Sequence, residues 1–211
     1  MLRIIQQNNN REWFEQNKQR YAEVKKEHEQ LLEQVIEGIS RFDAVTGSPA
    51  VKDCVFRIYR DVRFSPNKDP YKTHLGAFMA RGGRKSERPG FYLHIEPGNS
   101  MVGGGIYMPE PPVLKKIRDE IYFDAPALRG ILENKEFKKH FTGLYEDKLT
   151  RPPKGYDADF ADAELLKYKS YFVEKYFTDK EVTSPNFPTI VIKTCEAMMP
   201  IQQFLNRAFA E

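Results

Sequence analysis

Apolar residues recur at spacings of three, four and seven between residues 9 and 42, a pattern that predicts one long amphipathic helix. Asn9 is the predicted N-cap, because Glu12 stands three residues later and would complete a capping box with it. The sequence Thr-Gly-Ser-Pro at residues 46–49 ends the helical pattern. The chain is therefore expected to open with a long helix followed by a break.

Between residues 51 and 108 the pattern changes to alternation of apolar and polar residues, interrupted by glycine and proline. The connections are too short for the helical crossovers that parallel strands need, so the pattern predicts an antiparallel sheet of about four or five strands. The predicted strands are 54–64, 73–81, 90–96 and 101–108, with 170–177 as a further candidate.

The rest of the chain has mainly helical patterns. One helix is expected to begin in the proline-rich segment 109–112, where proline suits the first turn, and Pro200 is expected to kink or split the terminal helix that follows Ser184 and Pro185. Other predicted helices are 124–133, 134–142 and 160–169. No linker or repeat divides the chain, which predicts a single α+β domain over residues 1–211, an antiparallel sheet flanked by helices.

Composition narrows the function classes. The net charge is only +3, which argues against a dedicated nucleic-acid-binding protein, and 40% apolar residues indicate a globular rather than a disordered chain. No signal peptide or membrane span is recognisable, so we expect a cytoplasmic protein without membrane contact. Cys54 and Cys195 are isolated in apolar surroundings and are expected to be core residues.

Two of the predicted strands carry polar residues on one face. In 54–64 the polar row contains Arg57, Tyr59, Asp61 and Arg63, and in 90–96 it contains Tyr92, His94 and Glu96. The segment between the first two strands adds Lys68, Tyr71, Lys72 and His74. If the strands share a sheet, these side chains could lie together, although an antiparallel sheet often exposes such a row only to solvent.

Guanidinium, ammonium, phenol and imidazole groups on one face can bind an anion and move a proton. The first hypothesis is therefore a binding domain, or an enzyme, for a small anionic ligand that is phosphorylated or nucleotide-like. His94, paired with Asp61 or Glu96, is the candidate acid–base group. The predicted ligand-binding residues are Arg57, Tyr59, Arg63, Lys68, Tyr71, Lys72, His74 and Tyr92.

A second hypothesis is metal-assisted hydrolysis at His74, His94 and Glu96. No spacing such as HExxH supports it, so a hydrogen-bonding role for the histidines is favoured, no metal ligand is assigned, and the cofactor is left unknown.

A third hypothesis is a structural or interaction module that uses the basic hairpin at residues 81–88. The low net charge favours a solvated turn there, and nucleic acid is not an expected partner. The glycine run at residues 103–105 lacks the ending of a phosphate loop and favours a bulge or close strand packing. The oligomeric state stays open.

Several strings in the chain resemble a family known only as a conserved hypothetical protein, a domain of unknown function widespread in bacteria. They include Arg-Ile-Tyr-Arg-Asp-Val-Arg-Phe-Ser at 57–65, Pro-Tyr-Lys-Thr-His at 70–74 and Pro-Gly-Phe-Tyr-Leu-His-Ile-Glu-Pro-Gly at 89–98. The resemblance covers nearly the whole chain, from 8–14 to about residue 205. It implies no established reaction, cofactor or catalytic residue.

Overall fold

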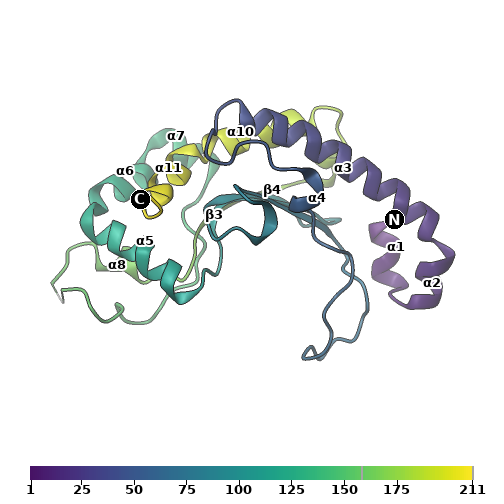
Figure 1. The fold of residues 1–211 in the computed structure, drawn as a ribbon, viewed down its shortest axis with the longest axis horizontal. Coiled ribbons are helices and arrows are strands. Elements are labelled where there is room, and N and C mark those ends of the chain that lie inside the picture. Colours follow the sequence, from purple (N-terminus) through teal and green to yellow (C-terminus); the bar gives the residue numbers. More distant parts are fainter. Residues whose placement is uncertain (158, 211) are drawn as a thin grey trace.

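A computed structural model describes residues 1–157 and 159–210 and contains a four-stranded antiparallel sheet surrounded by helices (Figure 1). The strands are β1 (Leu75–Met79), β2 (Gly90–Ile95), β3 (Ser100–Ile106) and β4 (Tyr171–Phe177), and they lie in the order β1-β2-β3-β4. Each strand pairs antiparallel with its neighbour. The predicted α+β class and the antiparallel sheet are confirmed.

Three helices pack on one face of the sheet: α3 (Lys18–Ser40), α10 (Phe187–Ala197) and α11 (Met199–Arg207). Figure 1 shows them together on one side of the strands, while the opposite side carries no helical layer. A Cβ atom at Gly38 of α3 would lie 2.5 Å from Cδ1 of Ile192, so the glycine allows α3 and α10 to approach closely. The main hydrophobic core lies between these helices and the sheet.

The remaining helices lie around the sheet and beside its ends. They are α1 (Leu2–Gln7), α2 (Arg11–Gln16), α4 (Val51–Cys54), η1 (Gly83–Lys85), α5 (Pro111–Phe123), α6 (Ala125–Glu133), α7 (Lys135–His140), α8 (Ala163–Leu166) and α9 (Asp179–Val182). In the part of the chain that the structure covers, no helix is both long and apolar enough to cross a membrane.

The predicted helix over 9–42 is divided into α2 and α3 by Asn17, whose φ and ψ of −109° and 14° are not helical. The N-cap of α2 is Asn10, which accepts a hydrogen bond from the Trp13 amide at 2.9 Å. The predicted N-cap, Asn9, was wrong by one residue. The side-chain amide of Asn9 instead donates to the Tyr71 carbonyl and accepts from the Tyr71 N–H. Asn9 therefore ties the N-terminal helices to the edge of the sheet.

At the other end of the chain, α10 and α11 are separate helices, and Pro200 lies in the first turn of α11. The predicted split of the terminal helix is confirmed. Cys54 and Cys195 are both buried, as expected.

The predicted strand 54–64 was wrong. Its first residue ends α4, and after it the segment makes only isolated bridges, Val55 with Ala77 and Tyr59 with Tyr71. The Arg63 backbone N–H donates to the Asp61 carboxylate at 3.3 Å, so it is not available for a hydrogen bond to a neighbouring strand. The segment runs instead as a long loop beyond the β1 edge (Figure 1).

Candidate functional site

The two faces of β2 are chemically different. Phe91 and Leu93 are completely buried toward the helices, whereas Tyr92 and His94 point to the other side and are only partly buried. The predicted alternation of this strand is therefore confirmed. We call the side with Tyr92 and His94 the open face.

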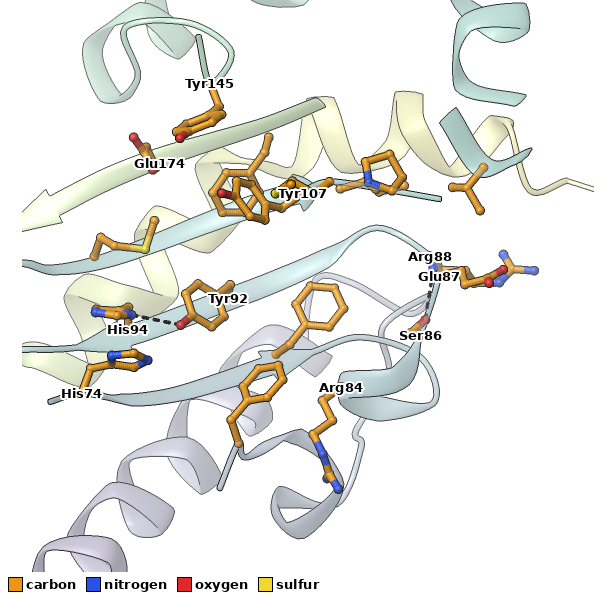
Figure 2. A pocket seen from close by; sticks show the side chains of 18 of the residues that line it. His74, Arg84, Ser86, Glu87, Arg88, Tyr92, His94, Tyr107, Tyr145 and Glu174 are labelled. Carbon is orange, nitrogen blue, oxygen red and sulfur yellow. Dashed lines mark hydrogen bonds between the residues drawn. The ribbon is translucent and has the colours of Figure 1, made fainter. Parts of the chain in front are cut away.

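A cavity of about 680 Å³ lies against the open face (Figure 2). Its volume falls within the range of about 300–1,000 Å³ typical of small-molecule sites. Residues from all four strands and from the segments after β1 and β3 line it. They are Phe56, Lys72, His74, Phe78, Arg84, Ser86, Glu87, Arg88, Tyr92, His94, Asn99, Met101, Ile106, Tyr107, Met108, Pro109, Glu110, Val113, Tyr145, Phe172, Glu174 and Tyr176.

Glycines make room for the aromatic side chains in this wall. A Cβ atom at Gly76 would lie 2.8 Å from the Tyr92 hydroxyl, and one at Gly103 would overlap the Phe172 ring. On the other face, a Cβ atom at Gly104 would lie 2.7 Å from Sδ of Met198 in the helical layer. The glycine run in β3 therefore allows close packing on both faces, in agreement with the packing role that its sequence favours.

A hydrogen-bonded row of side chains follows the end of β2. The Tyr92 hydroxyl lies 2.9 Å from Nδ1 of His94, and Nε2 of His94 lies 3.2 Å from Oε2 of Glu96. The His74 ring stacks on the His94 ring with 4.2 Å between their centroids (Figure 2). The pairing of His94 with Glu96 that the sequence offered as one option is present in the structure.

Glu96 is held in place by other hydrogen bonds. Thr73 donates to Oε1 at 2.6 Å, and Asn99 donates to Oε2 at 3.1 Å. Burial alone would raise the pKa of Glu96, but the hydrogen bonds from Thr73, Asn99 and His94 outweigh it and lower the pKa to about 2. Glu96 is therefore ionised at neutral pH and acts only as an acceptor.

Because the ionised Glu96 carboxylate can only accept, Nε2 of His94 is the donor in the contact between the two side chains. With a single proton on the ring, Nδ1 is then the acceptor for the Tyr92 hydroxyl. Burial raises the pKa of Tyr92 to about 12, so its hydroxyl keeps its proton.

His74 is neutral at pH 7, because burial and then the neighbouring His94 ring lower its pKa to about 4. Each of His74, His94 and Glu96 offers one ligand atom, and these three atoms lie within 4.8 Å of one another. The fold therefore assembles three potential metal ligands that are separated in the sequence by up to 22 residues (96 − 74).

Lys72 enters the same wall from the segment before β1. Its side chain is half-buried, and its ammonium lies 5.4 Å from the centre of the Phe56 ring. Burial, followed by the charge of Arg57, lowers the pKa of Lys72. Among the described residues, the Lys72 ammonium has no hydrogen-bond or ion-pair partner.

Several residues predicted for the site lie elsewhere. Asp61 and Arg63 form an exposed ion pair at 2.7 Å in the loop, so Asp61 does not pair with His94. Lys68 donates to the carbonyl of Val62. Because the predicted strand is a loop, these side chains do not join the open face.

Of the two predicted tyrosines outside β2, Tyr71 belongs to a small core beneath the N-terminal helices, and Tyr59 lies at its edge. Tyr71 is buried and stacks on Phe14 with ring centres 3.9 Å apart. Tyr59, half exposed, packs against Tyr71 at 5.5 Å. Neither lines the cavity. Arg57 is not in its wall either, although its charge acts on Lys72.

The cavity wall also contains residues that the sequence did not assign to the anion site. Arg84 bonds the carbonyls of Lys52 and Asp53 at 3.0 and 3.1 Å, so the basic hairpin is partly folded against α4 rather than being only a solvated turn. Glu174 projects from β4, and burial raises the pKa of its carboxyl group. The alternation of 171–177 is the signal that could have placed Glu174 on this face.

A comparison with protein families matches residues 1–204 to a family described as "Conserved hypothetical protein (DUF2461)". The match covers the sheet, the open face and the helices behind it. No curated protein and no solved structure matches the chain.

Proposed function

For this chain, which belongs to the family of conserved hypothetical proteins, we propose that it binds a small anionic molecule in the cavity on the open face. The description of the family names no activity. The observation that carries the proposal is the half-buried Lys72 ammonium, which makes no hydrogen bond or ion pair within the described chain and lies 5.4 Å from the centre of the Phe56 ring. A cation in such a place is stabilised when an anion binds next to it.

The argument for an anionic ligand depends on where the charged side chains lie in the cavity and not on how many of them are basic. Glu87, Glu110 and Glu174 also line the cavity, so its formal charge is not strongly positive. None of them pairs with Lys72 in the described chain, while Arg57 lies near enough to Lys72 to affect its pKa. The end of the cavity that contains Lys72 and the histidines is therefore the place for the anionic group.

The rest of the wall suits a flat or apolar body. Phe56, Phe78 and Tyr107 offer ring faces and edges, and Met101 adds a flexible apolar contact. A phosphorylated or nucleotide-like molecule combines such a body with an anion, and this is the ligand class we propose. The catalytic role predicted for His94 and Glu96 rests on their hydrogen bond and stays a prediction.

The test is thermal unfolding against inorganic phosphate, nucleotides, sugar phosphates and carboxylates. A bound compound at about 100 times its Kd should stabilise the protein by about 2.7 kcal/mol, or roughly 5–10 °C for a domain of this size. Lys72→Met should lose this shift. The matched control is Lys68→Met, which removes a lysine that bonds the Val62 carbonyl outside the cavity and should keep the shift.

The Tm of each variant without ligand shows whether it folds. A folded Lys72→Met protein with the wild-type shift, or a wild-type protein that no compound stabilises, would contradict the proposal.

A further inference from the structure

His74 differs from the other side chains of the open face because its position has no evident structural reason. Its ring stacks on His94 but makes no side-chain hydrogen bond to any described residue. The pair of His94 and Glu96 is already satisfied without it by Tyr92, Thr73 and Asn99. The His74 ring therefore places a second imidazole nitrogen, a potential metal ligand, beside the His94 imidazole and the Glu96 carboxylate.

We propose that His74, His94 and Glu96 bind one divalent transition-metal ion, such as Zn²⁺, at the edge of the cavity, whose wall includes both histidines. Two histidines and one carboxylate form a donor set that suits Zn²⁺ or Fe²⁺ and leaves coordination positions open. The inference deepens the proposed function, because the open positions would face the cavity and the anionic group of the ligand would bind the metal beside Lys72.

The geometry requires only small movements. Donors at about 2.0–2.1 Å from a tetrahedral metal lie about 3.3 Å from one another. The three ligand atoms lie within 4.8 Å of one another, so no pair has to close by more than about 1.5 Å. The stacked rings of His74 and His94 would tilt so that one nitrogen of each points at the metal.

The surrounding hydrogen bonds suit metal-bound ligands. Thr73 holds Oε1 of Glu96 and Asn99 holds Oε2, so the lone pair of Oε2 that faces Nε2 of His94 becomes available to the metal once that nitrogen no longer carries a proton. When Nε2 of His94 binds the metal, its proton moves to Nδ1, and the Tyr92 hydroxyl, now 2.9 Å away as a donor, becomes the acceptor. Such outer-shell partners orient a ligating imidazole, and their loss typically weakens metal binding about 10–100-fold.

Calorimetric titration of the full chain with Zn²⁺ alone tests the inference. We expect one Zn²⁺ per chain, about tenfold or greater weakening in Tyr92→Phe, and greater weakening in His74→Ala. His140→Ala is the matched control, because His140 is exposed on α7 and should not affect binding. Co²⁺ should give an absorption spectrum of nitrogen and oxygen ligands in the wild type but not in His74→Ala.

Thermal unfolding without metal identifies a variant that fails to fold, and Glu96→Gln then replaces it as the ligand variant. Zn²⁺ binding that is absent, or that folded His74→Ala and Glu96→Gln retain, overturns the inference. Lys72→Met separates the two proposals: it should keep Zn²⁺ binding while losing the anion-induced stabilisation. Zn²⁺ binding without any anion effect would support the metal site and contradict the proposed function.

Discussion

The two faces of the sheet are built from the same strands, yet they have opposite chemistry. On the covered face, Phe91 and Leu93 have no exposed surface and pack against the helical layer. On the open face, their neighbours Tyr92 and His94 form a hydrogen-bonded row beside a cavity. In such an alternating strand, the side chains on the covered face stabilise the fold, and the side chains between them are available for binding or catalysis.

The largest predicted effect comes from truncation on the covered face. Leu93→Ala removes a fully buried side chain from β2 and should lower the free energy of unfolding by about 2–5 kcal/mol. Tyr92→Phe, at the adjacent position on the open face, removes only one hydroxyl and should cost about 1 kcal/mol. Urea unfolding of both variants measures the contrast. Equal losses in the free energy of unfolding would contradict the prediction that the covered face contributes more to stability than the open face.

A smaller effect is expected where the open face itself is tightly packed. Gly103→Ala would push the Phe172 ring from its place, and such overpacking costs about 1–3 kcal/mol. Gly104→Ala on the covered face meets the flexible thioether of Met198 at 2.7 Å and should cost less. Since Phe172 lines the cavity, the first variant should also weaken ligand-induced stabilisation. Chemical unfolding and the ligand panel together check both effects.

The smallest effect is a pH dependence that arises on the covered side. His28 of α3 is buried, its Nε2 has no hydrogen-bond partner in the described chain, and burial lowers its pKa to about 4. The folded state therefore binds fewer protons than the unfolded state between about pH 6.5 and pH 4, and stability falls as the pH is lowered.

At about pH 5.5 the loss from His28 should be about 1 kcal/mol relative to pH 7. His28→Leu should lack that part of the dependence, which urea unfolding at the two pH values measures. The pKa of His74 is lowered in the same direction, but His74 is present in both proteins, so their difference isolates His28. An identical pH dependence in both proteins would contradict the prediction.

Sequence alone could predict β2 and its two faces because the strand alternates without interruption and lies between glycine and proline turns. It also placed the sheet, the α+β class and the split near Pro200 correctly. The segment 54–64 also alternates, with Arg60 as the exception, but is a loop. Alternation reports which side chains share a face of a strand, and it cannot report whether a neighbouring backbone is available to pair with that strand.

The same limit explains which residues of the site could be predicted from the sequence. Tyr92, His94 and Glu96 were predictable because they lie at alternate positions of one segment. The proximity of His74 depends on the pairing of Gly76 with His94, and that of Glu174 on the pairing of β4 with β3. Such registers are set by tertiary packing, which the alternation within a single sequence does not reveal.

We propose that the open face, and not the loop that carries Arg63, is the functional surface. The most direct test is nitrogen NMR of the histidine rings at about pH 8, with and without Zn²⁺. Without metal, His94 should carry its proton on Nε2, as its bond to ionised Glu96 requires. With Zn²⁺, the proton should move to Nδ1 of His94, and the signals of His74 should shift while those of His140 stay unchanged. Unchanged signals from both His74 and His94 would contradict the metal site on the open face.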